Sequence, residues 1–435
     1  MARLELILLL LAVSAALLVP ARRWGVPHPV LLVLGGAVLA VIPGLPEVTF
    51  DPEVAFVIFV PPLLYRTAVT GSVRDFRSEL WAILRLGILL VLVTIGVVAW
   101  TAHALSPEFT WGAAFTLAAI VAPPDSVAAT AVMRNLDAPG ALVSILEGEG
   151  LVNDATALVS YRMAVAAVVT GTFSTLHAAG GLLLTGAGGI VVGLIVARVI
   201  VWVRGFAREI PSVENTVSVL TPFVAYLPAD RLGASGVLSV VACGIYLSRV
   251  APRVVPPATR VQSEAMWSML NAWLEGIVFI LIGLELPRAY RALHHHSLGT
   301  LLGWSAIVSA VMILLRLVWV WPSAYIPRLV TRRPGPDGKR DRPLPSWRWV
   351  LTVGWAGMRG GDSIVIALAL PLVTARGTPF PARDLITFIT FGAVFATLVV
   401  QGLTLRPFLR LIGLHEDGLG DREELHARRV AAEAG

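Results

Sequence analysis

Three carboxylates lie close together in a stretch that is otherwise apolar enough to cross a membrane. They are Glu147, Glu149 and Asp154, within the segment Leu142 to Thr170. An ionised Asp or Glu at the centre of a bilayer costs on the order of 2.5 to 3.5 kcal/mol on insertion scales, so such residues persist mostly where they face a polar pathway. The segment therefore predicts a route for charged species inside the membrane.

Helical geometry assigns these acids to two faces. At about 100° per residue, Glu147 and Asp154 lie within about 20° of each other, and Gly150 leaves the stripe between them open. Glu149 and Asn153 are four residues apart and share a different face. We therefore expect Asp154 to face an ion cavity, while Glu149 turns toward a cationic partner.

Two other apolar segments are interrupted in the middle. The segment Trp111 to Met133 contains Pro123 and Pro124, which remove two backbone donors and clash with the preceding turn. The segment Trp347 to Val373 contains four glycines, at 354, 357, 360 and 361, together with charged residues. Irregular backbone at membrane depth is tolerated only where it is buried in protein or lines a cavity. Both segments are therefore expected to unwind.

The two interruptions supply partners for the acids. Asp125 follows the proline pair directly, so the first interruption is expected to border the cavity that Asp154 faces. Arg359 lies in the second interruption and is the best candidate partner for Glu149, because an unpaired buried Arg would be costly.

Composition identifies the class of protein. Hydrophobic residues make up 56% of the 435 positions and charged residues 14%, whereas soluble domains are about one-quarter charged. The mean hydropathy is +0.79. The net charge is +6, and the positively charged residues are scattered through loops between apolar spans. This distribution reflects membrane topology and not a nucleic-acid partner. The single cysteine, Cys243, excludes an intrachain disulfide.

The pattern of apolar segments predicts an all-α polytopic membrane protein with about 13 transmembrane helices, at roughly 20 residues per crossing. The segments are Leu4 to Pro20, Pro29 to Ile42, Val54 to Val69, Leu80 to Leu105, Trp111 to Met133, Leu142 to Thr170, Gly180 to Val203, Ser212 to Leu227, Ser235 to Leu247, Met266 to Leu286, Leu301 to Ile326, Trp347 to Val373 and Leu385 to Ile412. The fifth and the twelfth match in a six-plus-six inverted repeat with two crossing unwound helices, an arrangement that points to an ion site. Residues 1–414 form this transmembrane domain, and residues 415–435 are expected to be a short charged tail.

Loop charge predicts the orientation. Alternate loops hold about 17 Lys and Arg residues, and the loops between them hold about 5. Because positively charged loops stay in the cytoplasm, the N-terminus is expected outside and the C-terminus inside the cell membrane.

Six motifs spread over the chain carry a family resemblance. The run Glu147 to Val159, with its Gly-Glu-Gly-Leu-Val-Asn-Asp core, resembles the ion-binding helix of sodium/proton exchangers in the monovalent cation/proton antiporter superfamily. Five further segments are similar to that family's other motifs and follow in the same order: Phe59 to Tyr65, Ala119 to Val132, Ala234 to Ser248, Phe279 to Pro287 and Trp355 to Pro371.

The resemblance implies a thirteen-helix fold, usually a homodimer, with a core bundle that moves against a dimerisation bundle. It implies that Asp154 binds cation and proton in alternation and that Asn153 supports it. Asp125 and the unwound backbone at Pro124 would shape the site for the transported cation. By the same likeness, Glu149 and Arg359 form a structural ion pair, and the Asn-Asp pair is associated with electroneutral exchange.

Three positions depart from the family pattern and bear on ion selectivity. Many relatives have a hydroxyl before the Asp of the first interruption, whereas here Ser126 follows Asp125. Gly150 replaces a frequent serine, and Arg66 stands where many relatives have an acid. Ser126 and Glu147 are accessory candidates. A second interpretation places Glu147 in a hydrated cytoplasmic funnel.

Further charged residues keep more than one interpretation. Glu275 could contribute to the cavity electrostatics. Arg316 is expected to snorkel or to pair within the core, and it is given no ion role.

These features predict a transporter that exchanges Na⁺ for H⁺ and neither an enzyme nor a protein with a cofactor. K⁺ or Li⁺ could replace Na⁺ in the same mechanism. A cation channel would also need buried charge, but matched interruptions suit alternating access better than a continuous filter. An intramembrane aspartyl protease would need Gly-x-Gly-Asp, and Arg359 occupies the first Gly position before Asp362.

Overall fold

The computed structural model describes most of the chain, and the regular elements of the described residues are helical, as expected for an all-α protein. The described ranges are 2–24, 28–42, 52–70, 79–126, 129–130, 133, 140–171, 175–207, 210–330 and 345–413. The expected charged tail, residues 415–435, lies outside them.

The helices of the first half of the chain end with the segment that carries the three acids. They are α1 (Ala2–Trp24), α2 (His28–Leu39), α3 (Pro52–Thr70), α5 (Leu80–Leu84), the π-helical η1 (Arg85–Leu90), α6 (Val91–Leu105), α7 (Trp111–Val121) and α9 (Gly140–Thr170). Since α5, η1 and α6 follow one another without a gap, they act as one membrane crossing.

The second half contains the longest helices and the second interruption. Its helices are α10 (Thr175–Ala207), α11 (Pro211–Arg231), α12 (Gly236–Val254), α13 (Pro257–Ala292), α14 (Leu298–Val330), α15 (Trp347–Trp355), α16 (Gly361–Leu368), α17 (Arg383–Thr397), the π-helical η2 (Leu398–Gly402) and α18 (Leu403–Ile412). Joined across their interruptions, the helices of the described residues correspond to the thirteen predicted segments.

Several helices extend well beyond the apolar segments that revealed them. The predicted segment Met266 to Leu286 is part of α13, which runs for 36 residues. At 1.5 Å per residue this helix is about 54 Å long, whereas the hydrocarbon core of a bilayer is about 30 Å thick. Hydropathy detects only the part inside the apolar layer, so the predicted boundaries were too short. Within the described part of the chain, five helical stretches are long and apolar enough to span a membrane alone.

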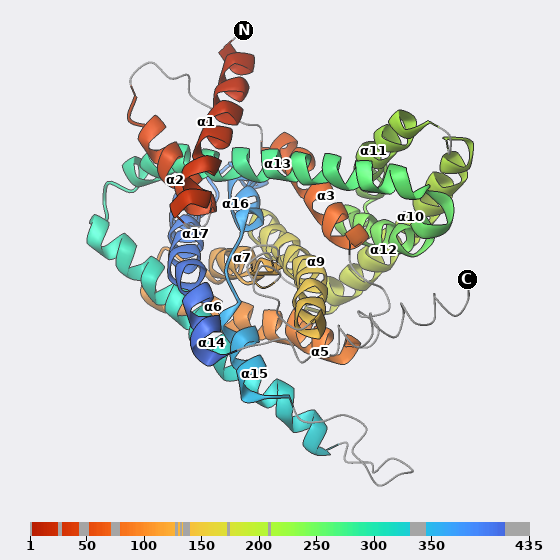
Figure 1. The fold of residues 1–435 in the computed structure, drawn as a ribbon. Helices are drawn as coiled ribbons and strands as arrows, with labels where there is room; N and C mark the ends of the chain where they lie inside the picture. Colours follow the sequence, from red (N-terminus) through yellow and green to blue (C-terminus); the bar gives the residue numbers. More distant parts are fainter. Residues whose placement is uncertain are drawn as a thin grey trace.

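The helices form two groups that meet at α3, α9 and α16 and where α13 packs on α17. In the first group, α13 packs on α2, and α10 packs on α12, which also contacts α3. In the second group, α6, α7 and α9 pack together, and α14 packs on α15 and α17. Figure 1 shows α13 crossing the top of the molecule, with α10 to α12 on the right and α6, α14 and α17 on the lower left.

Small residues allow the closest of these contacts. Gly36 of α2 and Gly283 of α13 face each other, and a Cβ atom added to Gly283 would lie 2.1 Å from the carbonyl oxygen of Val33. Any side chain at Gly283 would push the two backbones apart, which is why membrane helix interfaces are rich in small residues.

Candidate functional site

The two predicted interruptions cross each other at the centre of the protein. Helix α7 ends at Val121 and the chain is not helical through Asp125, while α15 ends at Trp355 and α16 begins at Gly361. The backbone N–H of Asp125 donates to the carbonyl oxygen of Met358 at 2.7 Å. The two unwound segments therefore satisfy each other's backbone groups, as buried irregular backbone must.

Gly360 makes this crossing possible. A Cβ atom built on Gly360 would lie 2.4 Å from Oδ2 of Asp125. A side chain there would collide with the carboxylate, so the glycine lets Asp125 lie directly against the second interruption.

A small cavity lies beside the crossing and has a volume of about 50 Å³, enough for a water molecule or a partly dehydrated ion. Four carboxylates line it, namely Asp125, Asp154, Asp362 and Glu275. The other lining residues are Leu63, Leu64, Thr67, Ser126, Asn271, Val278, Phe279 and Gly361. Asp125 and Asp154, which the sequence placed at one cavity, both line it.

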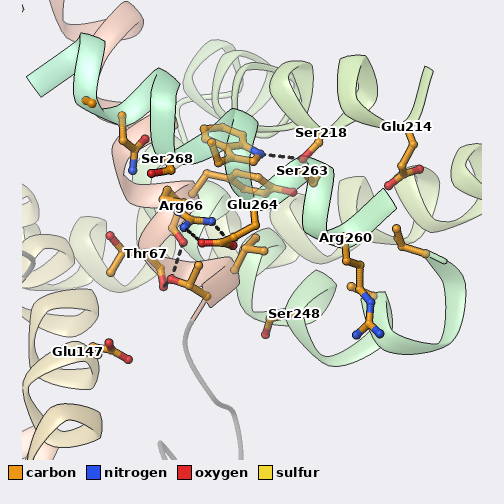
Figure 2. Close-up of a pocket in the computed structure, with 18 of the residues that line it drawn as sticks. Arg66, Thr67, Glu147, Glu214, Ser218, Ser248, Arg260, Ser263, Glu264 and Ser268 are labelled. Carbon is orange, nitrogen blue, oxygen red and sulfur yellow. Dashed lines mark hydrogen bonds and ion pairs between the residues drawn. The ribbon is translucent and has the colours of Figure 1, made fainter. Parts of the chain in front are cut away.

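A large cavity of about 710 Å³ adjoins the small one, and the two share Thr67, Ser126, Asn271 and Glu275. Glu147 of α9 lines the large cavity and faces it from the side opposite α11 and α13 (Figure 2). The stripe from Glu147 past Gly150 to Asp154 thus leads from the large cavity to the small one. This placement fits the interpretation of Glu147 as a hydrated residue of the entrance.

Arg66 and Arg204 line the large cavity, and both are held by acids. Arg66 on α3 makes a bidentate pair with Glu264 on α13, shown by dashed lines in Figure 2. Arg204 pairs with Glu214, with 3.1 Å between Nε and Oε1. The departure from the family pattern at Arg66 therefore lies in the wall of the large cavity, outside the lining of the small one.

Asn153 connects α9 to the first interruption through a hydrogen bond. Its side chain is completely buried, and Nδ2 donates to the carbonyl oxygen of Pro124 at 2.9 Å. The Oδ1 atom of the same side chain is buried and has no hydrogen-bond partner in the described part of the chain. A buried acceptor of this kind is costly unless another group completes it.

Gly150 makes room for Ser126. An ideal Cβ at Gly150 would lie 2.0 Å from Oγ of Ser126 and 2.7 Å from its Cβ. Ser126 lines both cavities, so the hydroxyl that follows Asp125 occupies the space that a side chain at residue 150 would need. The two departures from the family pattern, the glycine at residue 150 and the serine at residue 126, are therefore linked by this packing.

We expect Gly150→Ser to reduce transport by at least about tenfold, because the new side chain displaces Ser126 from a tightly packed position. The double variant Gly150→Ser with Ser126→Gly should restore transport to within about threefold of wild type, since the hydroxyl returns from the other helix. Initial rates in proteoliposomes measure both effects. A double variant no better than the single one would show that the two residues act separately.

The predicted ion pair between Glu149 and Arg359 is wrong. Glu149 is buried and is held in a bidentate pair by Arg316 of α14, with 2.8 Å between Nη2 and Oε2. Arg316 also donates from Nε to the carbonyl oxygen of Val353 at 3.1 Å. Arg359 instead donates from Nη1 to the carbonyl oxygen of Gly357 at 3.1 Å.

The physical reason lies in the second interruption. A Cβ on Gly357 would lie 2.3 Å from Cδ of Arg316, so the bare glycine lets Arg316 pass over the unwound segment to reach Glu149. Arg359 is part of that segment, and its side chain turns back on its own backbone. An Arg buried in the apolar helix α14 needs an acid, a signal that could have identified Arg316 from the sequence.

Sequence reasoning also missed Asp362 as a residue of the site. From the sequence, Asp362 is named only beside an incomplete protease motif, although an acid inside an interrupted membrane segment is by default a candidate for function. Thr67 and Asn271 carry no signal of this kind, since single polar residues in membrane helices are common. Within the described residues, no group of three or more His, Cys, Asp or Glu side chains is arranged to hold a resident metal ion.

Comparison with known proteins gives consistent matches along the chain. Residues 8–411 match the family model described as sodium/hydrogen exchanger, transmembrane. The chain is 33% identical over 393 residues to a sodium, potassium, lithium and rubidium/proton antiporter of Bacillus pumilus, covering 87% of this chain and 57% of the relative. It is also 33% identical to an uncharacterised sodium/proton exchanger of Mycobacterium bovis, covering 95% and 75%. The chain thus spans little more than half the length of the Bacillus relative.

The fold matches a solved structure. The sodium proton antiporter MjNhaP1 of Methanocaldococcus jannaschii, at pH 8, aligns with a TM-score of 0.67 over 94% of this chain and 98% of that one. The two sequences are 17% identical. At this identity the likeness concerns the fold.

Proposed function

The chain belongs to the sodium/hydrogen exchanger family, and from this premise we propose that it exchanges a monovalent cation, in the first place Na⁺, for H⁺ across the membrane. The observation that carries the proposal is the position of Asp154. This acid lines a small cavity beside two crossed, unwound helices, and a larger cavity leads to it. Interrupted helices around a central acid are the arrangement by which transporters bind ions at the bilayer midplane.

The exchange follows from competition for one carboxylate. A cation or a proton can neutralise Asp154, but both cannot do so at once. An empty, charged site crosses an apolar barrier at high cost, so only the loaded forms change sides readily. Movement of one ion in one direction is then coupled to movement of the other in return, one for one and without net charge.

The conformation fits a site that is open on one side. The large cavity lies against the first turns of α11, at Glu214 and Ser218. Arg162 lies on α9 about 12 Å beyond Asp154, away from Glu147. It donates to the hydroxyl of Tyr226 at 3.0 Å and to Asp230 at 3.1 Å, near the other end of α11. These contacts join the two helix groups on the side opposite the large cavity.

We assign the open side to the cytoplasm. The loops on that side are those that the sequence predicts to be positively charged, and such loops stay inside. The protein would then lie in the cell membrane with its N-terminus outside and its C-terminus in the cytoplasm. The family resemblance further implies a homodimer.

K⁺/H⁺ exchange by the same mechanism is the second candidate. The observation that favours it is the Bacillus pumilus relative, whose name includes sodium, potassium, lithium and rubidium. The four carboxylates of the small cavity attract any monovalent cation, and its volume does not by itself select one.

A dequenching assay in proteoliposomes tests the function. Vesicles with an acidic interior and a pH-sensitive dye receive Na⁺, K⁺ or Li⁺ in turn, with and without an imposed membrane potential. We expect Na⁺ to dissipate the pH gradient at a saturable rate that the potential changes by less than about twofold, since one-for-one exchange moves no net charge. A pH gradient that survives every cation would refute exchange, and nonsaturating flux driven by the cation gradient alone would indicate a channel.

A further inference from the structure

We propose that Asp362 is a second carboxylate ligand of the transported cation, so that the ion is held between Asp362 and Asp154. This inference rests on the proposed function and names a residue of the same site. Asp362 directly follows the second interruption, in which the sequence predicts a structural role for Arg359.

The crossing of the two interruptions fixes the position of Asp362. Asp125 is bonded through its N–H to Met358 and lies against Gly360 through its carboxylate. Asp362 follows two residues later, in the first turn of α16. Gly361 and Asp362 both line the small cavity, together with Asp154 from α9. Acids from two different helices therefore border the same 50 Å³ space.

The titratable side chains among the described residues that line this space are carboxylates. Asp154 interacts electrostatically with Asp362 and with Asp125, and Glu275 interacts with the same two aspartates. Among the described residues that line the small cavity there is no Lys, Arg or His. Like charges in a poorly solvated space repel strongly. A cation between Asp154 and Asp362 removes this repulsion, and one proton shared by the pair has the same effect.

A second observation, independent of the acids, also points to an ion. Asn153 is completely buried, and its Nδ2 is fixed on Pro124 at the crossing. This bond leaves its Oδ1 without a hydrogen-bond partner in the described part of the chain. Hard monovalent cations prefer oxygen ligands. Asn153 is not among the residues that line the small cavity, so its amide oxygen is a ligand candidate at the crossing, beside the two carboxylates that border the cavity.

This arrangement agrees with one-for-one exchange. The pair of Asp154 and Asp362 holds one positive charge in either loaded state, either a cation or a shared proton. The net charge of the pair is then −1 in both loaded forms, against −2 in the empty form, so a complete cycle moves no net charge and the loaded forms cross the apolar barrier at lower cost than the empty one. The second carboxylate would raise the affinity for the cation without changing the number of ions exchanged.

The dependence of the transport rate on Na⁺ concentration tests the role of Asp362. We compare wild type with Asp362→Asn, with Asp362→Glu and with the control Asp384→Asn. Asp384 is a half-exposed aspartate of α17 outside both cavities. In Asp362→Asn the KM for Na⁺ should rise by about tenfold or more, because cation affinity follows the charge of the ligands, while the maximal rate stays within about threefold. Asp362→Glu should recover most of the affinity, and Asp384→Asn should match wild type.

Binding of ²²Na⁺ to the purified protein in detergent provides a readout that does not depend on transport. It should weaken in Asp362→Asn by the same factor as the KM rises. An unchanged KM and unchanged binding in Asp362→Asn would overturn the proposal. A loss of maximal rate at constant KM in both Asp362→Asn and Asp362→Glu would also overturn it and would indicate a structural role.

If Asp362→Asn does not fold, binding by Asp362→Glu decides alone: an altered preference for Na⁺ over Li⁺ supports the role of Asp362 as a ligand, and an unaltered preference refutes it. Failure of the proposed function would appear separately, as wild-type protein that exchanges no cation.

Discussion

We expect Asp154→Asn to abolish cation/proton exchange in proteoliposomes, with a loss of at least about two orders of magnitude in initial rate. An amide of the same size fits the same cavity, but it carries no charge to neutralise a cation and releases no proton at neutral pH. The variant is therefore expected to lose both the binding of the cation and the binding and release of the proton. The variant keeps the other acids of the small cavity, namely Asp125, Asp362 and Glu275. Its exchange rate therefore shows whether these acids can replace Asp154 as the carrier.

The fold of this variant must be shown to be intact. The polar amide replaces a charged group next to a cavity, so the thermal unfolding temperature should change little or increase, because repulsion from Asp362 and Asp125 is relieved. Asp384→Asn serves again as the matched control and should exchange at the wild-type rate. Exchange at more than about a tenth of the wild-type rate in Asp154→Asn would move the carrier role to another carboxylate of the small cavity.

The sequence predicted those parts of the structure that have local causes. The thirteen segments follow from apolar length, and the first interruption follows from the steric effect of Pro123 and Pro124 on a helix. That Asp125 and Asp154 line one cavity could also be predicted, because unwound backbone in a membrane has to border a buried polar space. Each of these inferences needs only a few neighbouring residues.

Charge in an apolar segment marks Arg316 and Asp362 as candidates, but the pairing of Arg316 with Glu149 and the position of Asp362 at the small cavity could not be predicted in this way. Helical periodicity relates residues along one continuous helix, and the non-helical residues 357–360 break that relation between α15 and α16. The directions of Arg359 and Asp362 therefore depend on the path of the unwound chain. That path is set by contacts with Asp125 and Arg316, which come from distant parts of the sequence.

Glu149→Gln should destabilise the protein strongly, by about 3 to 5 kcal/mol, because it leaves Arg316 buried without a counter-ion. Arg359→Gln should cost only about 1 kcal/mol, which is the value of one hydrogen bond to Gly357. Thermal unfolding of the detergent-purified protein measures the difference. The Glu149 variant should unfold on the order of 5 to 10 °C below wild type, well below the Arg359 variant.

A double variant separates the ion pair from its members. Replacing both partners, as Glu149→Leu with Arg316→Met, removes the buried charges together and should recover most of the stability, since well-packed apolar residues often replace a buried pair without loss. Arg359→Gln combined with Glu149→Gln should recover none of it, because Arg316 remains uncompensated. The reverse pattern, with rescue of Glu149→Gln by the change at Arg359 and no effect at Arg316, would restore the pairing predicted from the sequence. The stability of the core therefore depends on an arginine in the eleventh segment, whose only sequence signal is a charge in an apolar helix.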